Sequence, residues 1–273
     1  MSIEHWIITH EATIRLSCFG GVLLLVALWE TLAPRRLRTV ARLTRWTSNL
    51  GIVVLNTVVL RLIFPAAAVG MAVFVGEQGW GVLNHYAVPP WVAVVLAVIA
   101  LDLVIYLQHV MVHAVPILWR LHRVHHADPD FDVTTGLRFH PLEILLSMLI
   151  KFTAIIAIGA PVIAVIVFEV LLNATAMFNH GNLRLPAGVD RWLRWFVVTP
   201  DMHRVHHSVD MDETNSNYGF NLPWWDRLFG TYRAQPRAGH AAMTIGLHEF
   251  RDPRQSTRLP GMLWMPFVTV RRE

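Results

Sequence analysis

The sequence has one cysteine, Cys18, and one lysine, Lys151, in 273 residues. A single cysteine excludes an internal disulfide and a metal site built from several thiolates. Any bound metal would therefore be held by nitrogen and oxygen ligands. Charged residues make up only 15% of the chain, and no stripe of stacked aromatic and basic residues suggests a partner nucleic acid.

Apolar residues are abundant instead. They make up 54% of the chain, which also contains 11 tryptophans, and this composition is typical of an integral membrane protein. Four apolar stretches are long enough to compare with the ~20 residues that span a bilayer. They cover about residues 16–32, 50–75, 91–107 and 144–172. The first lacks a preceding basic segment and a cleavage site, so it is expected to be a membrane anchor.

The fourth stretch is too long for one simple crossing. Gly159, Ala160 and Pro161 interrupt it, and proline breaks a helix. We therefore expect a helical hairpin here, while Pro65 and Gly70 are expected to bend the second stretch. The predicted fold is an all-α membrane bundle of about four transmembrane helices, the last pair forming a hairpin, with a cytosolic helical cap.

The arginines predict how the bundle is oriented. Residues 33–49 contain five arginines and residues 76–90 contain none, and cytoplasmic loops are enriched in arginine and lysine. The segment 33–49 is thus expected in the cytoplasm, together with everything after the hairpin. We expect a single membrane domain over 1–273, with N-terminal transmembrane helices (1–90), a histidine-rich core (91–232) and a cytosolic tail (233–273).

The pentapeptide His-Arg-Val-His-His occurs twice, at 122–126 and 203–207. Each copy sets three imidazoles at i, i+3 and i+4, which share one face of a helix. A further pair at i, i+4 precedes the first copy, and an isolated histidine lies between the copies. Nine histidines exceed what one ion can use, so we expect two metal ions with four or five ligands each. The nine are His109, His113, His122, His125, His126, His180, His203, His206 and His207.

Other polar residues are candidates for supporting roles. His140 is expected to be either a tenth ligand or a hydrogen-bond donor to a ligand. Asp102 lies within an apolar stretch, where a carboxylate is costly unless it is paired or functional. It is expected to support the ligands by hydrogen bonding, as are Glu143 and Asn179. Arg123 and Arg204, the arginines of the two pentapeptides, are expected to point away from the metals.

Zinc, copper and iron all accept imidazole. A structural zinc site needs only four ligands and usually includes cysteine. A larger all-nitrogen site for two ions beside a membrane favours redox-active iron.

These motifs resemble the fatty acid hydroxylase and sterol desaturase superfamily of membrane di-iron proteins. The resemblance covers roughly residues 91–232, whereas the first ninety residues match only as generic membrane helices. It rests on the histidine pair, the two H-x-x-H-H triplets and the isolated His180, together with segments 138–141, 217–219 and 225–231. The resemblance implies that the nine histidines bind two iron ions, which zinc can replace in purified protein, and that dioxygen is a co-substrate.

The resemblance also implies partners and a reaction. A lipid substrate, which is a fatty acyl, sterol-like or isoprenoid compound, would enter from the bilayer between the third helix and the hairpin. Electrons would come from a separate ferredoxin, b-type cytochrome or reductase, because this sequence contains no fused cytochrome domain. Hydroxylation is the leading expectation, and desaturation with the same metal centre is the runner-up. Two alternatives come from other functional classes: a zinc-dependent membrane hydrolase and a metal transporter.

Overall fold

The computed structural model describes residues 3–269 and shows helices with only two isolated β-bridges in this range. The predicted domain ends at 1–2 and 270–273 lie outside the described residues. The long helices are α2 (Glu11–Leu32), α3 (Arg42–Ile63), α4 (Ala67–Gln78), α6 (Pro90–Ala114), α7 (Pro116–His126), α8 (Pro141–Ile158) and α9 (Val162–Asn179). The short helices are α1 (Ile3–Thr9), α5 (Val82–His85), η1 (Thr135–Leu137), α10 (Ala187–Leu193), α11 (Pro200–His206), α12 (Met211–Thr214), α13 (Trp224–Leu228), α14 (Gly239–Ala242), α15 (Pro253–Ser256), α16 (Leu259–Trp264) and η2 (Met265–Phe267).

Five segments of residues 3–269 are long and apolar enough to cross a membrane. They are α2, the segment Arg42–His85, α6, α8 and α9. The all-α membrane fold predicted from the sequence is confirmed. The fifth segment arises because the fourth apolar stretch divides into two helices.

The predicted hairpin is α8 and α9, two helices of 18 residues each, or about 27 Å. Gly159 ends α8 with a left-handed backbone (φ 70°), and Pro161 immediately precedes α9. A side chain at Gly159 would place its Cβ 2.7 Å from the carbonyl oxygen of Trp80. Glycine is therefore required here by both conformation and space.

The second apolar stretch bends at Pro65, as expected. It forms α3 and α4, which are separated by Phe64, Pro65 and Ala66, whereas Gly70 lies inside α4. The first of these helices begins earlier than the apolar pattern suggests, because Arg42 and Arg45 already belong to α3.

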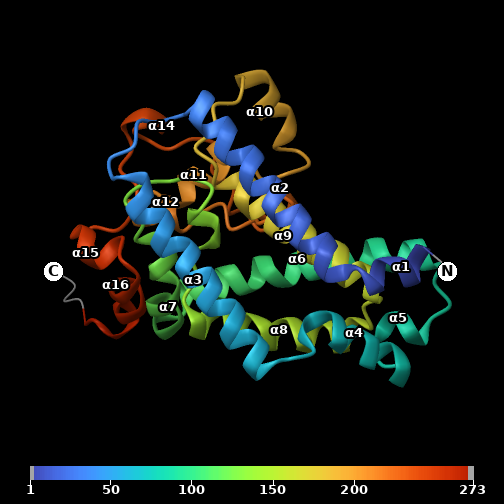
Figure 1. The fold of residues 1–273 in the computed structure, drawn as a ribbon. Coiled ribbons are helices and arrows are strands. Elements are labelled where there is room, and N and C mark those ends of the chain that lie inside the picture. The colour runs from blue at the N-terminus through green and yellow to red at the C-terminus, as the bar shows by residue number, and fades with distance from the viewer. Residues whose placement is uncertain (1–2, 270–273) are drawn as a thin grey trace.

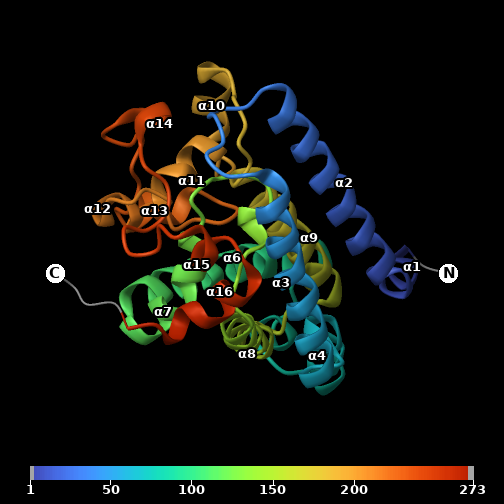
Figure 2. The same cartoon turned by 60° about the vertical axis from the view of Figure 1, so that its left-hand side comes forward.

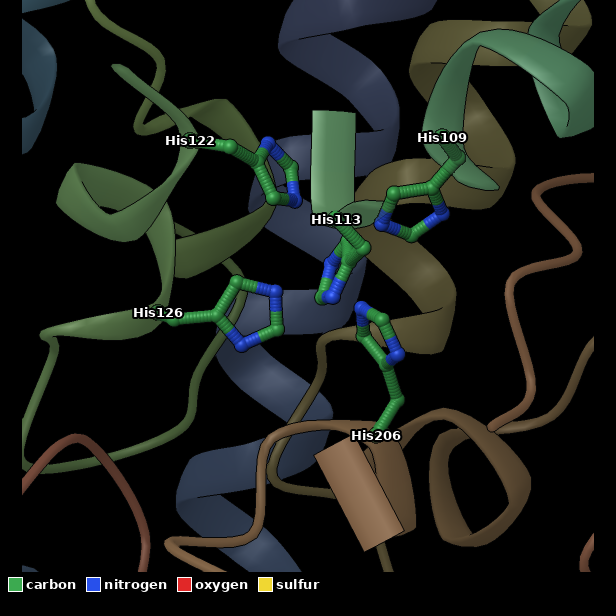
Figure 3. Close-up of side chains that lie close together, drawn as sticks. All are labelled: His109, His113, His122, His126 and His206. Carbon is green, nitrogen blue, oxygen red and sulfur yellow. The ribbon is translucent and has the colours of Figure 1, made fainter. Parts of the chain in front are cut away.

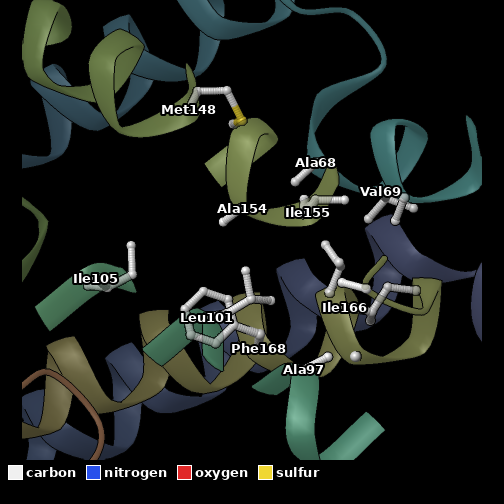
Figure 4. Close-up of a cluster of buried hydrophobic side chains, with 14 of the residues drawn as sticks. Ala68, Val69, Ala97, Leu101, Ile105, Met148, Ala154, Ile155, Ile166 and Phe168 are labelled. Carbon is white, nitrogen blue, oxygen red and sulfur yellow. The ribbon is translucent and has the colours of Figure 1, made fainter. Parts of the chain in front are cut away.

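The hydrophobic core of the bundle lies among α4, α6, α8 and α9 (Figure 4). Small side chains at Ala68, Ala97 and Ala164 are fully buried and let these helices approach closely. Larger side chains, including Leu101, Ile155 and Phe168, fill the space between them. The core thus fixes α6 against the hairpin.

Both pentapeptides lie at the same end of this bundle. The helix α6 runs toward the end where α7 and α11 lie, α8 runs away from it and α9 returns (Figures 1 and 2). The N-terminal α1 and the short α5 lie at the opposite end. The hairpin is therefore what brings residues 203–207 back to the first pentapeptide.

The C-terminal segment packs against α7 from outside. Arg123 donates to the carbonyl oxygens of Met265 (2.5 Å) and Val268 (2.6 Å), so it points away from the histidines as expected. Val124 lies in a small core with Met262 and Met265. Residues 259–268 thereby hold the first pentapeptide in place.

Candidate metal centre

The nine predicted histidines form two groups whose ring nitrogens lie within 4.8 Å of one another. The first group has five members and the second has four: His109, His113, His122, His126 and His206, and then His125, His180, His203 and His207. All are buried except His113, which is partly buried. Figure 3 shows the five rings of the first group converging from α6, α7 and α11.

Each pentapeptide divides its histidines between the two groups. In the first copy, His122 and His126 belong to the first group and His125 belongs to the second. In the second copy the assignment is reversed, because His203 and His207 belong to the second group and His206 to the first. The i and i+4 positions thus serve one group and i+3 serves the other. The two copies are interleaved across the site.

Hydrogen bonds fix the rings of the first group so that Nε2 faces the interior. The Nδ1 atoms of His109 and His206 donate to the carbonyl oxygens of Tyr218 and Ser216, each at 2.7 Å. The His122 Nδ1 is 2.6 Å from a carboxylate oxygen of Glu143. Among residues 3–269, the buried Nε2 atoms of these three rings have no hydrogen-bond partner. Bare Nε2 atoms opposite a hydrogen-bonded Nδ1 are typical of histidines that bind metal.

The second group converges on His180. Its Nδ1 donates to the carbonyl oxygen of Ala176 (2.7 Å), which leaves Nε2 without a proton. This Nε2 lies 3.1 Å from the Nε2 atoms of His125 and His203 and 3.2 Å from that of His207. One lone pair cannot accept from three rings. Nitrogens each ~2.1 Å from a shared ion would be about 3.0–3.4 Å apart, so the spacing fits a metal.

Burial favours the neutral form of five of these imidazoles. Removal from water lowers the pKa of His180 and of His206 to about 3, and lowers the pKa values of His125, His126 and His207 well below the usual range. Neutral imidazole is the form that binds a metal. The unpartnered nitrogens and the neutral rings together fit a first-row transition metal.

The supporting residues differ in what they contact. Glu143 contacts His122 directly, whereas Asn179 donates to the Phe220 carbonyl oxygen at 3.0 Å. The Asp102 carboxylate accepts from the indole nitrogen of Trp225 at 2.8 Å and from two backbone amides of the segment 221–222. Asp102 thereby anchors the segment that follows Phe220 and touches no histidine in the described residues.

His140 lies outside both groups. Its Nδ1 accepts from the Leu142 amide (3.2 Å) as the N-cap of α8, and its Nε2 donates to the Leu263 carbonyl oxygen at 3.2 Å. Both ring nitrogens thus face away from the two groups. The ion pair of Arg204 with Asp201 also points away from the histidines, as expected.

Two networks of hydrogen bonds and ion pairs that support the site were not predicted from the sequence. Asp226 accepts from the backbone amides of Tyr218 (2.8 Å) and Gly219 (2.9 Å), and the Tyr218 carbonyl oxygen in turn holds His109. In the second network, the fully buried Arg45 of α3 pairs with Asp128 (2.7 Å) and Asp132 (2.6 Å). The sequence does contain signals of the second network, because three aspartates alternate directly after the first pentapeptide and Arg45 precedes an apolar run.

A cavity of about 300 Å³ reaches the first group from within the bundle. It lies among α3, α6, α8 and α9, and His109 and His122 are part of its lining. Its walls are largely apolar and include Ile105, Met148 and Leu172. Near Lys151, the wall is polar, because Lys151 pairs with Glu169 at 2.7 Å.

Comparison with known proteins agrees with this site. The model of the fatty acid hydroxylase family matches residues 94–231, about half of the chain. Ornithine lipid hydroxylase OlsE of Rhizobium tropici is 31% identical over 180 residues, which cover 63% of this chain and 54% of that protein. The alkylglycerol monooxygenases of Xenopus tropicalis and Homo sapiens are each 30% identical, over 63% of this chain and 37% of theirs. No solved structure matches.

The chain belongs to the fatty acid hydroxylase family, as its motifs predicted. It is a multi-pass membrane protein with a histidine-rich site of the kind used by metal-dependent oxygenases. The chain spans between about a third and about half the length of the curated relatives it matches. The family match contains all nine histidines of the two groups.

Proposed function

We propose that the protein is a membrane di-iron oxygenase that hydroxylates a C–H bond of a lipid. The observation that carries this proposal is the convergence of nine imidazoles, eight of them buried, two of which line a largely apolar cavity. The names of the relatives, lipid hydroxylase and monooxygenase, support hydroxylation over desaturation.

The two groups of histidines would each hold one iron ion. Bound iron would supply dioxygen activation and cleavage of an unactivated C–H bond. The reaction consumes a C–H bond, dioxygen, two electrons and two protons, and yields an alcohol and water. The protein holds the rings in place through the Nδ1 hydrogen bonds of His109, His122 and His206, and the enclosing helices exclude bulk water.

The substrate would lie in the cavity of about 300 Å³ with its reacting carbon next to His109 and His122. Apolar walls suit a hydrocarbon segment of a fatty acyl, sterol-like or isoprenoid lipid. The position of the cavity between α6 and the hairpin agrees with entry from the bilayer. Its volume fits a segment of a lipid and not a whole phospholipid.

We propose that the site faces the cytoplasm, because the arginine-rich segment 33–49 lies on the same side of the bundle as the histidines. A separate ferredoxin, b-type cytochrome or reductase would then deliver electrons there. The whole of 1–273 would act as one domain. A metal transporter would instead place its ligands near mid-membrane, whereas these histidines lie at and beyond the ends of α6 and α9.

The test is lipid profiling of cells that express the protein in the presence of labelled dioxygen. The expected result is one labelled hydroxyl in a membrane lipid, absent from cells that express His125→Ala or His206→Ala at the same level. A new double bond in a lipid, without label, would show that the reaction is desaturation and not hydroxylation. An unchanged lipid profile, despite folded protein that contains iron and receives electrons, would overturn the oxygenase proposal.

A further inference from the structure

An arginine-rich cavity lies on the cap, away from the histidines. Its volume is about 650 Å³, and it lies beside α10 and the segment that follows α2. Five arginines and two aspartates line it: Arg35, Arg184, Arg191, Arg194, Arg227, Asp190 and Asp201. The cavity therefore has an excess of positive charge.

Both aspartates are already paired. Asp190 binds Arg194 Nε at 2.8 Å and accepts from the Thr199 hydroxyl at 2.6 Å. Asp201 pairs with Arg35 at 3.1 Å. Among residues 3–269, the side chains of Arg184, Arg191 and Arg227 form no ion pair with a carboxylate, and Arg227 Nη2 donates only to the Arg194 carbonyl oxygen at 3.2 Å. Their positive charges are therefore available to an anion.

The wall also contains buried donors without a partner. Arg194 is only 4% exposed, and its Nη2 has no hydrogen-bond partner in the described part of the chain. The guanidinium of Arg227 lies over the rings of Trp195 (4.1 Å) and Tyr232 (4.3 Å), and its buried Nε is likewise unpartnered. Unsatisfied guanidinium donors that are held rigidly are suited to phosphate oxygens.

A second, apolar groove lies along the bundle near this cavity. It has a volume of about 700 Å³ and lies between α2 and α9, where its walls include Leu25, Leu28 and Phe178. Leu32 of the groove is three residues before Arg35 of the cavity, and Val197 is two residues after Trp195. The groove and the cavity are thus lined by residues that are close in sequence at two points of the chain.

Exposed aromatic side chains lie in and directly after α10, beside the cavity, which Trp195 lines. Trp192, Trp195 and Phe196 are each more than half exposed, although they are large and apolar. Tryptophans in such positions are typical of the level of the lipid headgroups. This places the arginine-rich cavity at headgroup level and the groove at the level of the acyl chains.

We propose that the cavity and groove together bind a phospholipid with an anionic headgroup. The arginines hold the phosphate, and an acyl chain lies between α2 and α9. Since both aspartates are paired with arginine, the cavity has no free carboxylate for the ammonium group of a zwitterionic lipid. An acidic protein would explain the charge but not the nearby apolar groove.

This lipid is distinct from the substrate. Ala174, Thr175 and Phe178 line the groove, whereas Leu172, Asn173 and Ala176 line the cavity next to the histidines. The two sets lie on different faces of α9, so the helix separates the bound phospholipid from the reaction site. The site is therefore independent of the proposed oxygenase activity.

Native mass spectrometry of the detergent-purified full chain, titrated with phosphatidylglycerol or phosphatidylcholine, tests this. Phosphatidylglycerol is expected to bind more tightly. The pair Arg184→Gln and Arg191→Gln, both on exposed side chains, should weaken it roughly tenfold. The matched control is Arg254→Gln with Arg258→Gln, two exposed arginines outside the cavity, which should leave binding unchanged. Leu28→Trp should also weaken binding by filling the groove.

Three results would overturn the proposal. Equal binding of the two lipids would show that the site does not require an anionic headgroup. If the control pair weakened lipid binding equally, the effect would come from the overall charge of the protein and not from this cavity. Tight binding of free glycerol phosphate, insensitive to Leu28→Trp, would make this a site for a soluble phosphate compound.

Discussion

The imidazole rings of His126 and His207 stack with their centroids 4.5 Å apart and their planes at 16°. These residues end the two pentapeptides and belong to different groups. The stack therefore forms a shared wall between the groups. Two adjacent sites that share such a wall suit a dinuclear centre.

Glu143 is expected to strengthen metal binding through His122. Its carboxylate is 2.6 Å from Nδ1, on the side of the ring opposite to the bare Nε2. Glu143→Ala should lower metal affinity by about 10–100-fold, measured as metal retained against a chelator. Glu249→Ala, an exposed carboxylate outside the site, is the control. Equal retention in both variants would show that Glu143 does not act on the metal.

Gly136 is expected to be essential for the position of His180. A Cβ at Gly136 would lie 2.4 Å from the Ala176 carbonyl oxygen, which accepts from His180, and 3.0 Å from His180 Nδ1. Gly136→Ala should destabilise the fold by about 1–3 kcal/mol and reduce the bound metal. Thermal unfolding and metal analysis measure the two effects. In Gly188→Ala the added Cβ meets no atom within 4 Å, so this control should keep its metal.

Asp226 is expected to position His109 through the Tyr218 carbonyl. One carboxylate oxygen accepts from the Tyr218 amide and the other from the Gly219 amide. In Asp226→Asn, the amide nitrogen of the new side chain would face one of these donors, at a cost of about 1–3 kcal/mol. The expected result is a lower unfolding temperature together with weaker metal binding. Asp252→Asn retains an N-cap on an exposed helix and should be neutral. Unchanged metal binding in Asp226→Asn would show that this network does not support metal binding by His109.

The sequence predicted the parts of the structure that depend on local spacing. Histidines at i, i+3 and i+4 share a helix face in any fold, and Gly159 with Pro161 breaks a helix wherever it lies. The division of each pentapeptide between two groups was not predictable, because it depends on how α7 and α11 lie against each other. The partners of Asp102 were also hidden, since its contacts are about 120 residues away in sequence.

For His140, the sequence suggested a role as a ligand that the tertiary structure does not give it. Its spacing and flanking motif allowed a ligand, but in the structure it caps α8 and binds the carbonyl of Leu263, which is 123 residues later. Arg45 likewise looked like a loop arginine, although the aspartates that bury it lie more than 80 residues away. Such tertiary pairings leave no periodic signal in one sequence.

The most direct test of the account is the ratio of metal to protein in paired histidine variants. The interleaved arrangement predicts that two changes in one group, His122→Ala with His206→Ala, leave about one metal ion per chain of the two in the unchanged protein. Two changes within one pentapeptide, His122→Ala with His125→Ala, strike both groups and should leave almost none. The opposite pattern, or one ion or none in the unchanged protein purified from native membranes, would contradict the account.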